Sequence, residues 1–422
     1  MFLILKCARI FTGKDDSILR DHAVIIEGNR IAAIAPCANI AISPDAQVID
    51  LGEGTLLPGL IDLHAHPTYY FRRPDAVEFA RPVFTDALIA LFAVSQLQKD
   101  LNAGITTVRD TGAVNRLSHD IEIARRKGFV RVPRLCTSGR LIIPTGGHVH
   151  DRLGLTHEAD GVEGVRAAVR AEIKSGAAFI KIATNGADFL CDEIQAHARD
   201  IQRVVNGVEY SQDEINVAVI ETHRAGLKIA CHTRWRPAVV KAITAGVDTL
   251  EHGTYMTDDD MRAIADKRIV WVPTIFQGIA TIKLRQKMRD EIANGQRAND
   301  ALNDGALSEE SYERRRHLFE LALKLGVTMG AGTDIFKPEV NFAALVDEMQ
   351  AFVDFGMTRA QALQIGTRIN AHALGWDDQI GTIAPGKFAD IIFVAGNPLN
   401  DLDALRDPKL VMIDGEIVAQ KK

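Results

Sequence analysis

The sequence predicts an α/β protein with a (β/α)8 TIM barrel over residues 58–375 and a small β-sandwich domain built from both termini, residues 1–57 and 376–422. In the middle of the chain, short apolar runs alternate repeatedly with amphipathic stretches of helical period. Both ends instead contain short β-type runs between turn residues. A length of 422 residues is enough for one barrel with an addition.

The two ends of the chain show the same sequence pattern, in which short predicted strands alternate with turns. The predicted strands are Phe2–Leu5, Ala23–Glu27, Ile31–Ile34, Gln47–Ile49, Gly381–Ile383, Ala389–Val394, Leu410–Ile413 and Ile417–Val418. The Asp414-Gly415 pair between the last two runs is a good hairpin signal, because both residue types tolerate the positive φ angles of a tight turn. We therefore expect both ends to contribute to one β domain.

The middle of the chain predicts eight strands separated by helical segments. The strands are Leu60–Leu63, Ile105–Val108, Arg134–Thr137, Phe179–Ala183, Lys228–Cys231, Val247–Leu250, Ile269–Pro273 and Val327–Gly332. The helices include Thr85–Leu101, Gly164–Ser175, Ser211–Ala225, Pro237–Ala245, Asp258–Lys267 and Ser308–Leu325. Ser211 and Glu214 resemble a capping box. A doubly wound open sheet is the alternative architecture, but no Gly-x-Gly-x-x-Gly sequence opens a helix here.

The composition is that of an ordinary globular chain, with 47% hydrophobic and 25% charged residues and a formal net charge of −6. This slight negative excess does not favour binding to nucleic acid or to an anionic membrane. No apolar run approaches the ~18–20 residues of a membrane span, and no basic segment precedes the apolar patch at the start. Five cysteines without a CxxC pair favour a reducing compartment, so we expect a cytoplasmic protein.

Polar side chains occur in, or directly after, five of the predicted barrel strands. They are His64, His66, Lys181, His232, His252 and Asp334. The carboxyl ends of the strands meet at one face of a barrel, where such enzymes carry their chemistry. A polar residue in a buried strand is unfavourable unless something pairs with it. His64 and His66 are two apart on a strand, so their side chains point the same way and can hold one metal ion.

Each of these residues also has an ordinary structural explanation. The His64-x-His66 pair could be two surface histidines at a strand exit, and Lys181 could extend its ammonium group to solvent from a sheet edge. His232 and His252 could be hydrogen-bonded core histidines, and Asp334 could cap a helix. These explanations would all have to hold together, in barrel order, for the metal-site interpretation to be wrong.

The ordered set of residues resembles the amidohydrolase superfamily. The stretch Pro58–His66 is similar to the first metal-binding motif of the superfamily. The later motif positions match at Lys181, His232, Glu251-His252-Gly253 and Gly332-Thr333-Asp334. The stretch Gly381–Asp390 is similar to the signature of the C-terminal β domain. Ser138-Gly139-Arg140 followed by Thr145-Gly146-Gly147-His148 is similar to the strand-three loop of one branch of that superfamily. This branch contains the imidazolonepropionase-like and the Xaa-Pro dipeptidase (prolidase)-like enzymes.

The resemblance implies a binuclear site for two divalent metal ions, usually zinc. His64, His66 and Asp334 would hold one ion, and His232 and His252 would hold the other. Lys181 would bridge both as N6-carboxylysine, a carbamate made with carbon dioxide. Electrostatics agrees, because two buried cations need anionic ligands. A hydroxide held by the metals would attack the substrate, and Asp334 would take its proton and later pass it to the departing amine.

Candidate substrate contacts lie in the loops after the strands. His148 could donate to the developing oxyanion, although a solvated loop histidine is the alternative. Tyr69 and Tyr70 follow the first two histidines and could line the pocket or pack under the loop. Arg234 stands where relatives often carry a second histidine. It could pair with a substrate carboxylate, or belong with Arg236 to a surface cluster of charges.

We therefore predict a hydrolase that cleaves a C–N amide bond of a small molecule. The leading substrate class is a dipeptide of the Xaa-Pro type or an N-acyl amino acid. A urea, carbamate or other xenobiotic amide cleaved on the same site is one alternative. A non-catalytic assembly protein on the same fold is another, although all six ligand positions are intact. We expect no nucleic-acid or membrane partner, and we expect a homo-oligomer.

Overall fold

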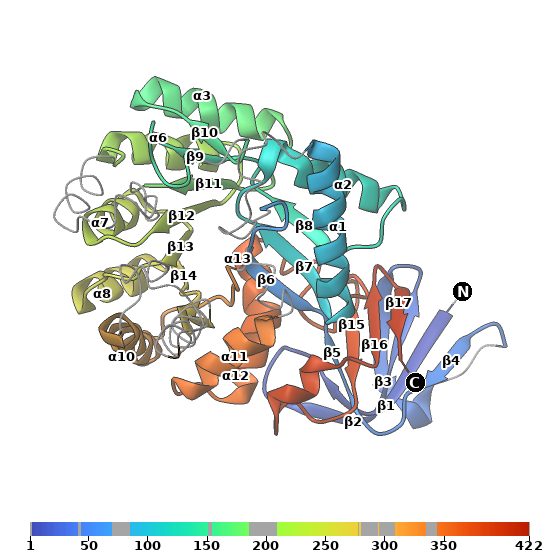
Figure 1. The fold of residues 1–422 in the computed structure, drawn as a ribbon. Helices are drawn as coiled ribbons and strands as arrows, with labels where there is room; N and C mark the ends of the chain where they lie inside the picture. The colour runs from blue at the N-terminus through green and yellow to red at the C-terminus, as the bar shows by residue number, and fades with distance from the viewer. Residues whose placement is uncertain are drawn as a thin grey trace.

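Parallel strands lie at the centre of the molecule with helices around them, and strands from both chain ends form a separate sheet at one side (Figure 1). The computed structural model describes residues 2–40, 44–69, 85–150, 154–184, 209–276, 278–279, 294, 309–334 and 344–421. Within these ranges, no helix is both long and apolar enough to cross a membrane. The predicted α/β class is confirmed.

The terminal sheet contains eight strands in the described part of the chain. They are β1 (Phe2–Phe11), β2 (Ile18–Glu27), β3 (Arg30–Pro36), β4 (Gln47–Asp50), β5 (Thr55–Pro58), β15 (Ile391–Val394), β16 (Leu410–Ile413) and β17 (Glu416–Gln420). β5 pairs with β1 on one side and with β15 on the other, so both chain ends share one sheet. The predicted hairpin between β16 and β17 is confirmed, and Asp414 and Gly415 have φ angles of 52° and 77°.

The prediction of a strand over Gly381–Ile383 is wrong. Gly381 has a φ of 84°, which takes the backbone out of the extended region. A Cβ atom at this position would lie 2.5 Å from the Cβ of Ala371, so the chain needs glycine where it passes this close. The segment is held instead by single contacts, such as the hydrogen bond from Ile383 N–H to Thr12 O (2.9 Å).

Nine parallel strands make up the central sheets of the described chain. They are β6 (Leu60–Ala65), β7 (Ile105–Asp110), β8 (Arg134–Thr137), β9 (Leu141–Ile143), β10 (Thr156–Glu158), β11 (Ile180–Ala183), β12 (Ile229–Thr233), β13 (Thr249–His252) and β14 (Val270–Val272). β6, β7 and β8 form one sheet, and the other has the order β10-β9-β11-β12-β13-β14. Seven of the nine overlap predicted strands; β9 and β10, at three residues each, give too short a pattern to recognise.

Backbone hydrogen bonds connect these two parallel sheets on both sides. Ala178 N–H, just before β11, donates to Thr137 O at the end of β8 (2.8 Å). On the other side, Trp271 N–H in β14 donates to Thr328 O (3.0 Å), and Leu63 N–H in β6 donates to Ala331 O (3.0 Å). The segment 327–334 therefore lies between β14 and β6.

The predicted strand Val327–Gly332 forms only one isolated bridge, between Met329 and Trp271. A buried side chain replaces part of its ladder. Asn370 Oδ1 accepts the Ala331 N–H (3.1 Å), and Asn370 Nδ2 donates to Ala331 O (2.9 Å) and to Ile61 O (2.7 Å). The segment is thus fixed by a side chain from a later helix, which no local pattern can show.

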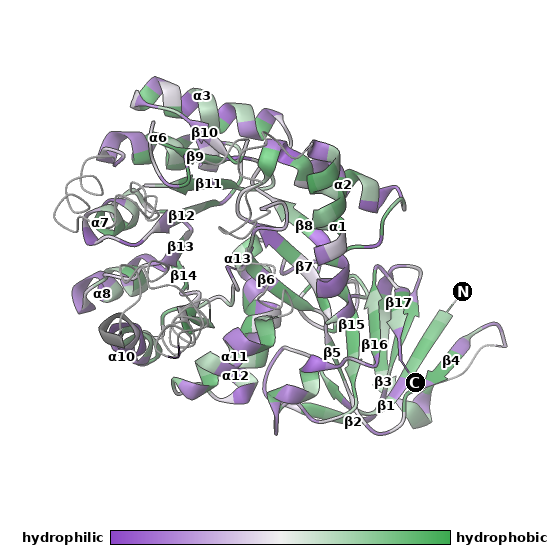
Figure 2. Cartoon of the chain, in the orientation of Figure 1, coloured by the Kyte–Doolittle hydropathy of each residue, from purple (hydrophilic) through white to green (hydrophobic). Residues whose placement is uncertain are grey.

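Helices surround the central strands. They are α1 (Asp86–Asn102), α2 (Leu117–Arg126), α3 (Gly161–Lys174), α6 (Gln212–Arg224), α7 (Arg236–Ala245), α8 (Asp258–Lys267), α10 (Glu309–Leu325), α11 (Leu345–Asp354), α12 (Arg359–Gln364) and α13 (Asn370–Leu374). The six predicted helices are present, and Ser211 and Glu214 form the predicted capping box. Figure 2 shows largely hydrophobic strands and helices that also carry hydrophilic residues, as expected for an outer layer in contact with water.

Replacing Asn370 with alanine should destabilise the fold. The change removes three hydrogen bonds to buried backbone groups, of which Ala331 O keeps its bond from Leu63 N–H. We expect a loss of about 2–4 kcal/mol in the free energy of unfolding. Chemical denaturation of the chelator-treated protein measures it. Asn102→Ala, at the exposed end of α1, is the matched control and should change stability by less than about 0.5 kcal/mol. Equal stability of the two variants would show that Asn370 does not hold this segment.

Candidate metal centre

Polar side chains from different strands meet at the carboxyl end of the parallel strands. His64 lies in β6, His232 lies in β12 and His252 ends β13, whereas His66 directly follows β6. Asp334 ends the segment 327–334, and its N–H donates to His64 O (2.7 Å). Because the strands run parallel, their carboxyl ends lie at the same edge.

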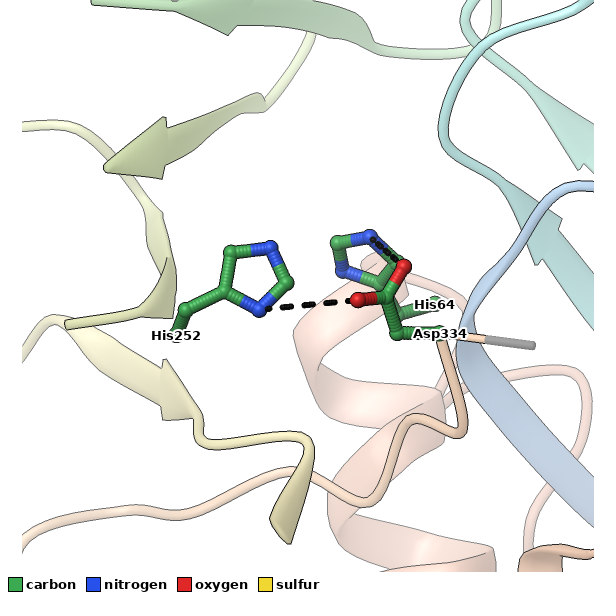
Figure 3. Close-up of side chains that lie close together, drawn as sticks. All are labelled: His64, His252 and Asp334. Carbon is green, nitrogen blue, oxygen red and sulfur yellow. Dashed lines mark ion pairs between the residues drawn. The ribbon is translucent and has the colours of Figure 1, made fainter. Parts of the chain in front are cut away.

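Asp334 stands at the centre of three of these histidines. Its Oδ1 lies 3.5 Å from His64 Nε2 and 3.6 Å from His66 Nε2, and its Oδ2 lies 3.9 Å from His252 Nδ1. Figure 3 shows the side chains of His64, His252 and Asp334 pointing toward one another. Each of these three offers one atom that could ligate a cation, all within 4.8 Å of one another. Such a spacing fits a divalent metal ion between them.

His232, His148 and Lys181 border the same cluster. The His232 ring lies 4.6 Å from that of His252, measured between centroids, and His148 stacks on His232 at 3.9 Å. His148 is 8% exposed, so it is a buried residue of the cluster rather than a solvated loop histidine. Lys181 is 2% exposed in β11, and its Nζ has no hydrogen-bond partner among the described residues. It therefore does not extend to solvent.

Two of the residues in this cluster have strained backbones. His252 has a φ of 67° and Asp334 a φ of 50°, and Thr274, which contacts His252, also has a φ of 50°. Non-glycine residues rarely adopt this left-handed region, least of all β-branched ones such as threonine. Strain of this kind persists where the surroundings hold it and often marks a functional site. Here it aims the side chains of His252 and Asp334 into the cluster.

The electrostatics of the cluster suits cation binding. Burial, followed by the charge of Lys181, lowers the pKa of His64 to about 4. Burial also holds the pKa values of His232 and His252 well below their usual range, so all three imidazoles are neutral at pH 7 and keep a lone pair for a cation. Burial alone would raise the pKa of Asp334, but the neighbouring basic groups, His64 first among them, lower it overall, and the carboxylate is ionised.

Buried neighbours orient His64. Its Nδ1 lies 2.6 Å from Glu251 Oε2, which leaves Nε2 to face Asp334. The other oxygen of Glu251 accepts from Arg109 Nη2 (2.7 Å) and from Thr249 Oγ1 (2.5 Å). A carboxylate behind a histidine in this way fixes its tautomer and is common around metal sites.

Other buried groups orient Asp334 and His252. Asp62 accepts from the His64 and Thr333 N–H groups (3.0 and 3.1 Å) and from Thr333 Oγ1 (2.7 Å). His252 Nδ1 lies 2.7 Å from Thr274 Oγ1. Sequence reasoning did not identify these supporting residues, although Asp62 and Glu251 stand inside the two quoted motifs as carboxylates on apolar strands, which is a usable signal.

Two of the remaining candidates, Tyr69 and Arg234, are buried. Tyr69 is buried 6.1 Å from His66 between ring centroids, in a small apolar cluster; Tyr70 lies outside the described residues. The Arg234-Trp235-Arg236 stretch divides into two environments. Arg234 is buried, whereas Arg236 is exposed and pairs with Asp260 (3.0 Å). Only Arg234 of the two arginines is therefore available to the cluster.

Comparisons with known proteins agree with this picture. A family model described as the amidohydrolase family matches residues 55–418, and one described as the NagA composite domain matches residues 1–54. Ochratoxinase of Aspergillus niger is 26% identical over 94% of this chain and 82% of its own length.

Two solved structures resemble the whole chain. A Xaa-Pro dipeptidase with methionine bound in its active site is 25% identical, with a TM-score of 0.81, and the match covers 99% of this chain and 100% of that one. A prolidase in complex with N-methylphosphonate-L-proline is 26% identical, with a TM-score of 0.82 and full coverage of both chains. The family match spans most of the chain, as the order of its polar residues indicated. The protein therefore belongs to the amidohydrolase family and is a hydrolase that acts on carbon–nitrogen bonds.

Proposed function

We propose that this enzyme is a binuclear metal-dependent amidohydrolase that cleaves the C–N amide bond of a dipeptide of the Xaa-Pro type or of an N-acyl amino acid. The observation that carries the proposal is that His64, His66 and His252 surround Asp334. The His232 ring lies beside that of His252, and the buried Lys181 ammonium has no hydrogen-bond partner among the described residues. The substrate class is supported by the similarity to a Xaa-Pro dipeptidase and to a prolidase bound to a phosphonate analogue of a proline peptide. Zinc is the expected metal, since imidazole and carboxylate ligands suit it.

We infer that the two parallel sheets are parts of one (β/α)8 barrel. The backbone hydrogen bonds between the two sheets support this inference. The eight strands of the barrel would be β6, β7, β8, β11, β12, β13, β14 and the segment 327–334. Residues 1–57 and 376–422 would form the second domain. The cytoplasmic location and the homo-oligomeric state stay predictions from the sequence.

In the proposed site, His64, His66 and Asp334 would hold one ion, His232 and His252 would hold the other, and Lys181, as its N6-carboxylate, would supply an anionic ligand to both. Burial lowers the pKa of Lys181 to about 8, so a useful fraction of the amine is neutral at pH 7. A neutral Nζ can add to the carbon of carbon dioxide and release a proton, which gives the carbamate. This turns an unpaired buried cation into an anion that two metal ions can share.

Residues of the chain would then bind the substrate and transfer the proton. Metal ions held there would supply Lewis acidity toward the scissile carbonyl and would lower the pKa of water. Asp334, kept ionised in the apo protein, accepts the proton of the attacking water and returns it to the leaving amine. His148, stacked beside His232, donates to the developing oxyanion. Tyr69, whose ring lies near that of His66, and the buried Arg234 would contact the substrate.

A substrate screen on the zinc-loaded enzyme tests this function. Xaa-Pro dipeptides and N-acyl amino acids should be hydrolysed, with activity lost on chelation and restored by zinc, as measured by release of the free amino acid. Turnover of aryl ureas or carbamates alone would reject the substrate class. No turnover by a metal-loaded protein of any of these amides would reject the catalytic proposal itself.

Lys181→Ala should lower the bound metal from two ions per chain to one or none, because the bridging anion is lost. Elemental analysis after dialysis against zinc measures this ratio. Acetate or propionate should restore part of the second ion by standing in for the carbamate. Lys174→Ala, exposed on α3, is the control and should keep two ions. Two ions per chain in the Lys181 variant would show that this lysine does not bridge them.

Thr274→Val should weaken zinc binding by about tenfold, because His252 loses the hydrogen bond that orients its ring. Valine keeps the β-branched shape, so the strained backbone is matched. Thr274→Ser retains the hydroxyl and should bind zinc like the wild type. Competition with a chromophoric chelator gives the two dissociation constants, and equal values for valine and serine would contradict the role of this contact.

A further inference from the structure

Helix α10 carries a buried guanidinium group that is only partly satisfied. Arg315 is 3% exposed, and its Nη2 donates to Thr254 Oγ1 (3.0 Å). Its Nε and Nη1 have no hydrogen-bond partner among the described residues. Arg109, also buried, places Nε, Nη1 and Nη2 on Leu63 O, Thr249 and Glu251. Buried donors are rarely left unsatisfied, and a buried charge even less often.

This guanidinium lies next to the metal centre. Thr254, its partner, stands two residues after His252. The same loop bends back to β12, because Tyr255 N–H donates to Arg234 O (3.0 Å). Arg234 itself is buried two residues after His232. Two arginines from different parts of the chain thus lie beside the ends of β12 and β13, where His232 and His252 are located.

No described carboxylate takes up this positive charge by a hydrogen bond. Glu348, the carboxyl group that raises the pKa of Arg315 most, accepts instead the N–H groups of Ile275 (2.9 Å) and Phe276 (2.6 Å). Burial, and then the charge of Arg234, lower the pKa of Arg315 to about 10, so the group is still a cation at pH 7. An anion bound here would meet unused donors on Arg315 and relieve the repulsion between the two arginines.

We propose that Arg315, together with Arg234, binds the carboxylate of the substrate and so selects anionic amides over neutral ureas and carbamates. This rests on the proposed function, since it assigns the substrate class of the same site. The metal ions would hold the scissile amide while the arginine pair holds the carboxylate. Arg315 is then a specificity-determining residue, and its position on α10 explains why the strand-end motifs do not reveal it.

The test compares acids with their neutral amides on the zinc-loaded enzyme. The probe pairs are glycyl-L-proline with glycyl-L-prolinamide, and N-acetyl-L-phenylalanine with its carboxamide. In Arg315→Met, the preference in kcat/KM for acid over amide should fall by about 10- to 100-fold, mostly through KM, as expected for lost charge-assisted hydrogen bonds. Arg316→Met, whose arginine pairs with Glu320 on the surface of the same helix, should keep the wild-type preference.

Stability and binding separate this role from a structural one. The melting temperature of the ligand-free Arg315→Met protein should equal or exceed that of the wild type, because an unsatisfied cation is removed. Arg315→Lys should keep part of the acid preference. A wild type without acid preference, or an equal loss for acid and amide in Arg315→Met, would overturn the proposal.

Direct binding distinguishes the failure of this inference from the failure of the proposed function. If neither acid is hydrolysed, equilibrium dialysis of N-acetyl-L-phenylalanine still measures the subsite. Weaker binding to Arg315→Met than to the wild type would support the arginine subsite while rejecting the reaction. Hydrolysis of the acids with identical KM values in both proteins would support the reaction and reject the subsite.

Discussion

The fit of segment 327–334 against β6 is the constraint on which the site depends. Asp334 N–H bonds to His64 O (2.7 Å), and the Asp62 carboxylate holds both the His64 N–H and the Thr333 N–H. A Cβ at Gly332 would lie 2.6 Å from the Cβ of His64, so only glycine permits this approach. The consequence is that one oxygen of Asp334 faces both His64, in β6, and His66, directly after it.

The cluster is a set of buried polar groups, and the Nζ of Lys181 has no hydrogen-bond partner in the described part of the chain. The imidazoles of His64, His232 and His252 are neutral because burial lowers their pKa values, and Asp334 is ionised because basic groups surround it. Glu251 and Arg109 show the opposite case, a buried ion pair with its hydrogen bonds filled within the chain. Lys181 and Arg315 have no hydrogen-bonded carboxylate of this kind among the described residues. In our two proposals, Lys181 would bind the metal ions and Arg315 would bind the substrate.

The sequence predicted the secondary structure best where a pattern was long or its ends were marked. Asp258–Lys267 is a helix with the predicted bounds, and the Asp414-Gly415 turn forms the expected hairpin. Prediction failed where distant residues decide the backbone. Gly381–Ile383 looks like a strand, but Gly381 packs against Ala371 with a positive φ. Segment 327–332 shares its hydrogen bonds with Asn370, almost forty positions later in the chain.

The candidate ligands were accessible to sequence reasoning because each lies in, or directly after, a predicted apolar strand, where a polar residue needs an explanation. Parallel pairing then requires those strand ends to lie at one edge. Residues whose role depends on contact with another side chain have no such signal in the sequence. Thr274 contacts His252, and Arg315 is brought to Thr254 by α10.

The sequence by itself therefore determined the class of fold, the family and the identity of the candidate ligands, because these follow from local periodicity and from residue types at strand ends. Only the tertiary structure decided which donors are left unsatisfied, which arginine is buried and which is exposed, and how each histidine is oriented. Those properties depend on burial and on contacts between segments far apart in the chain, and they have no local pattern.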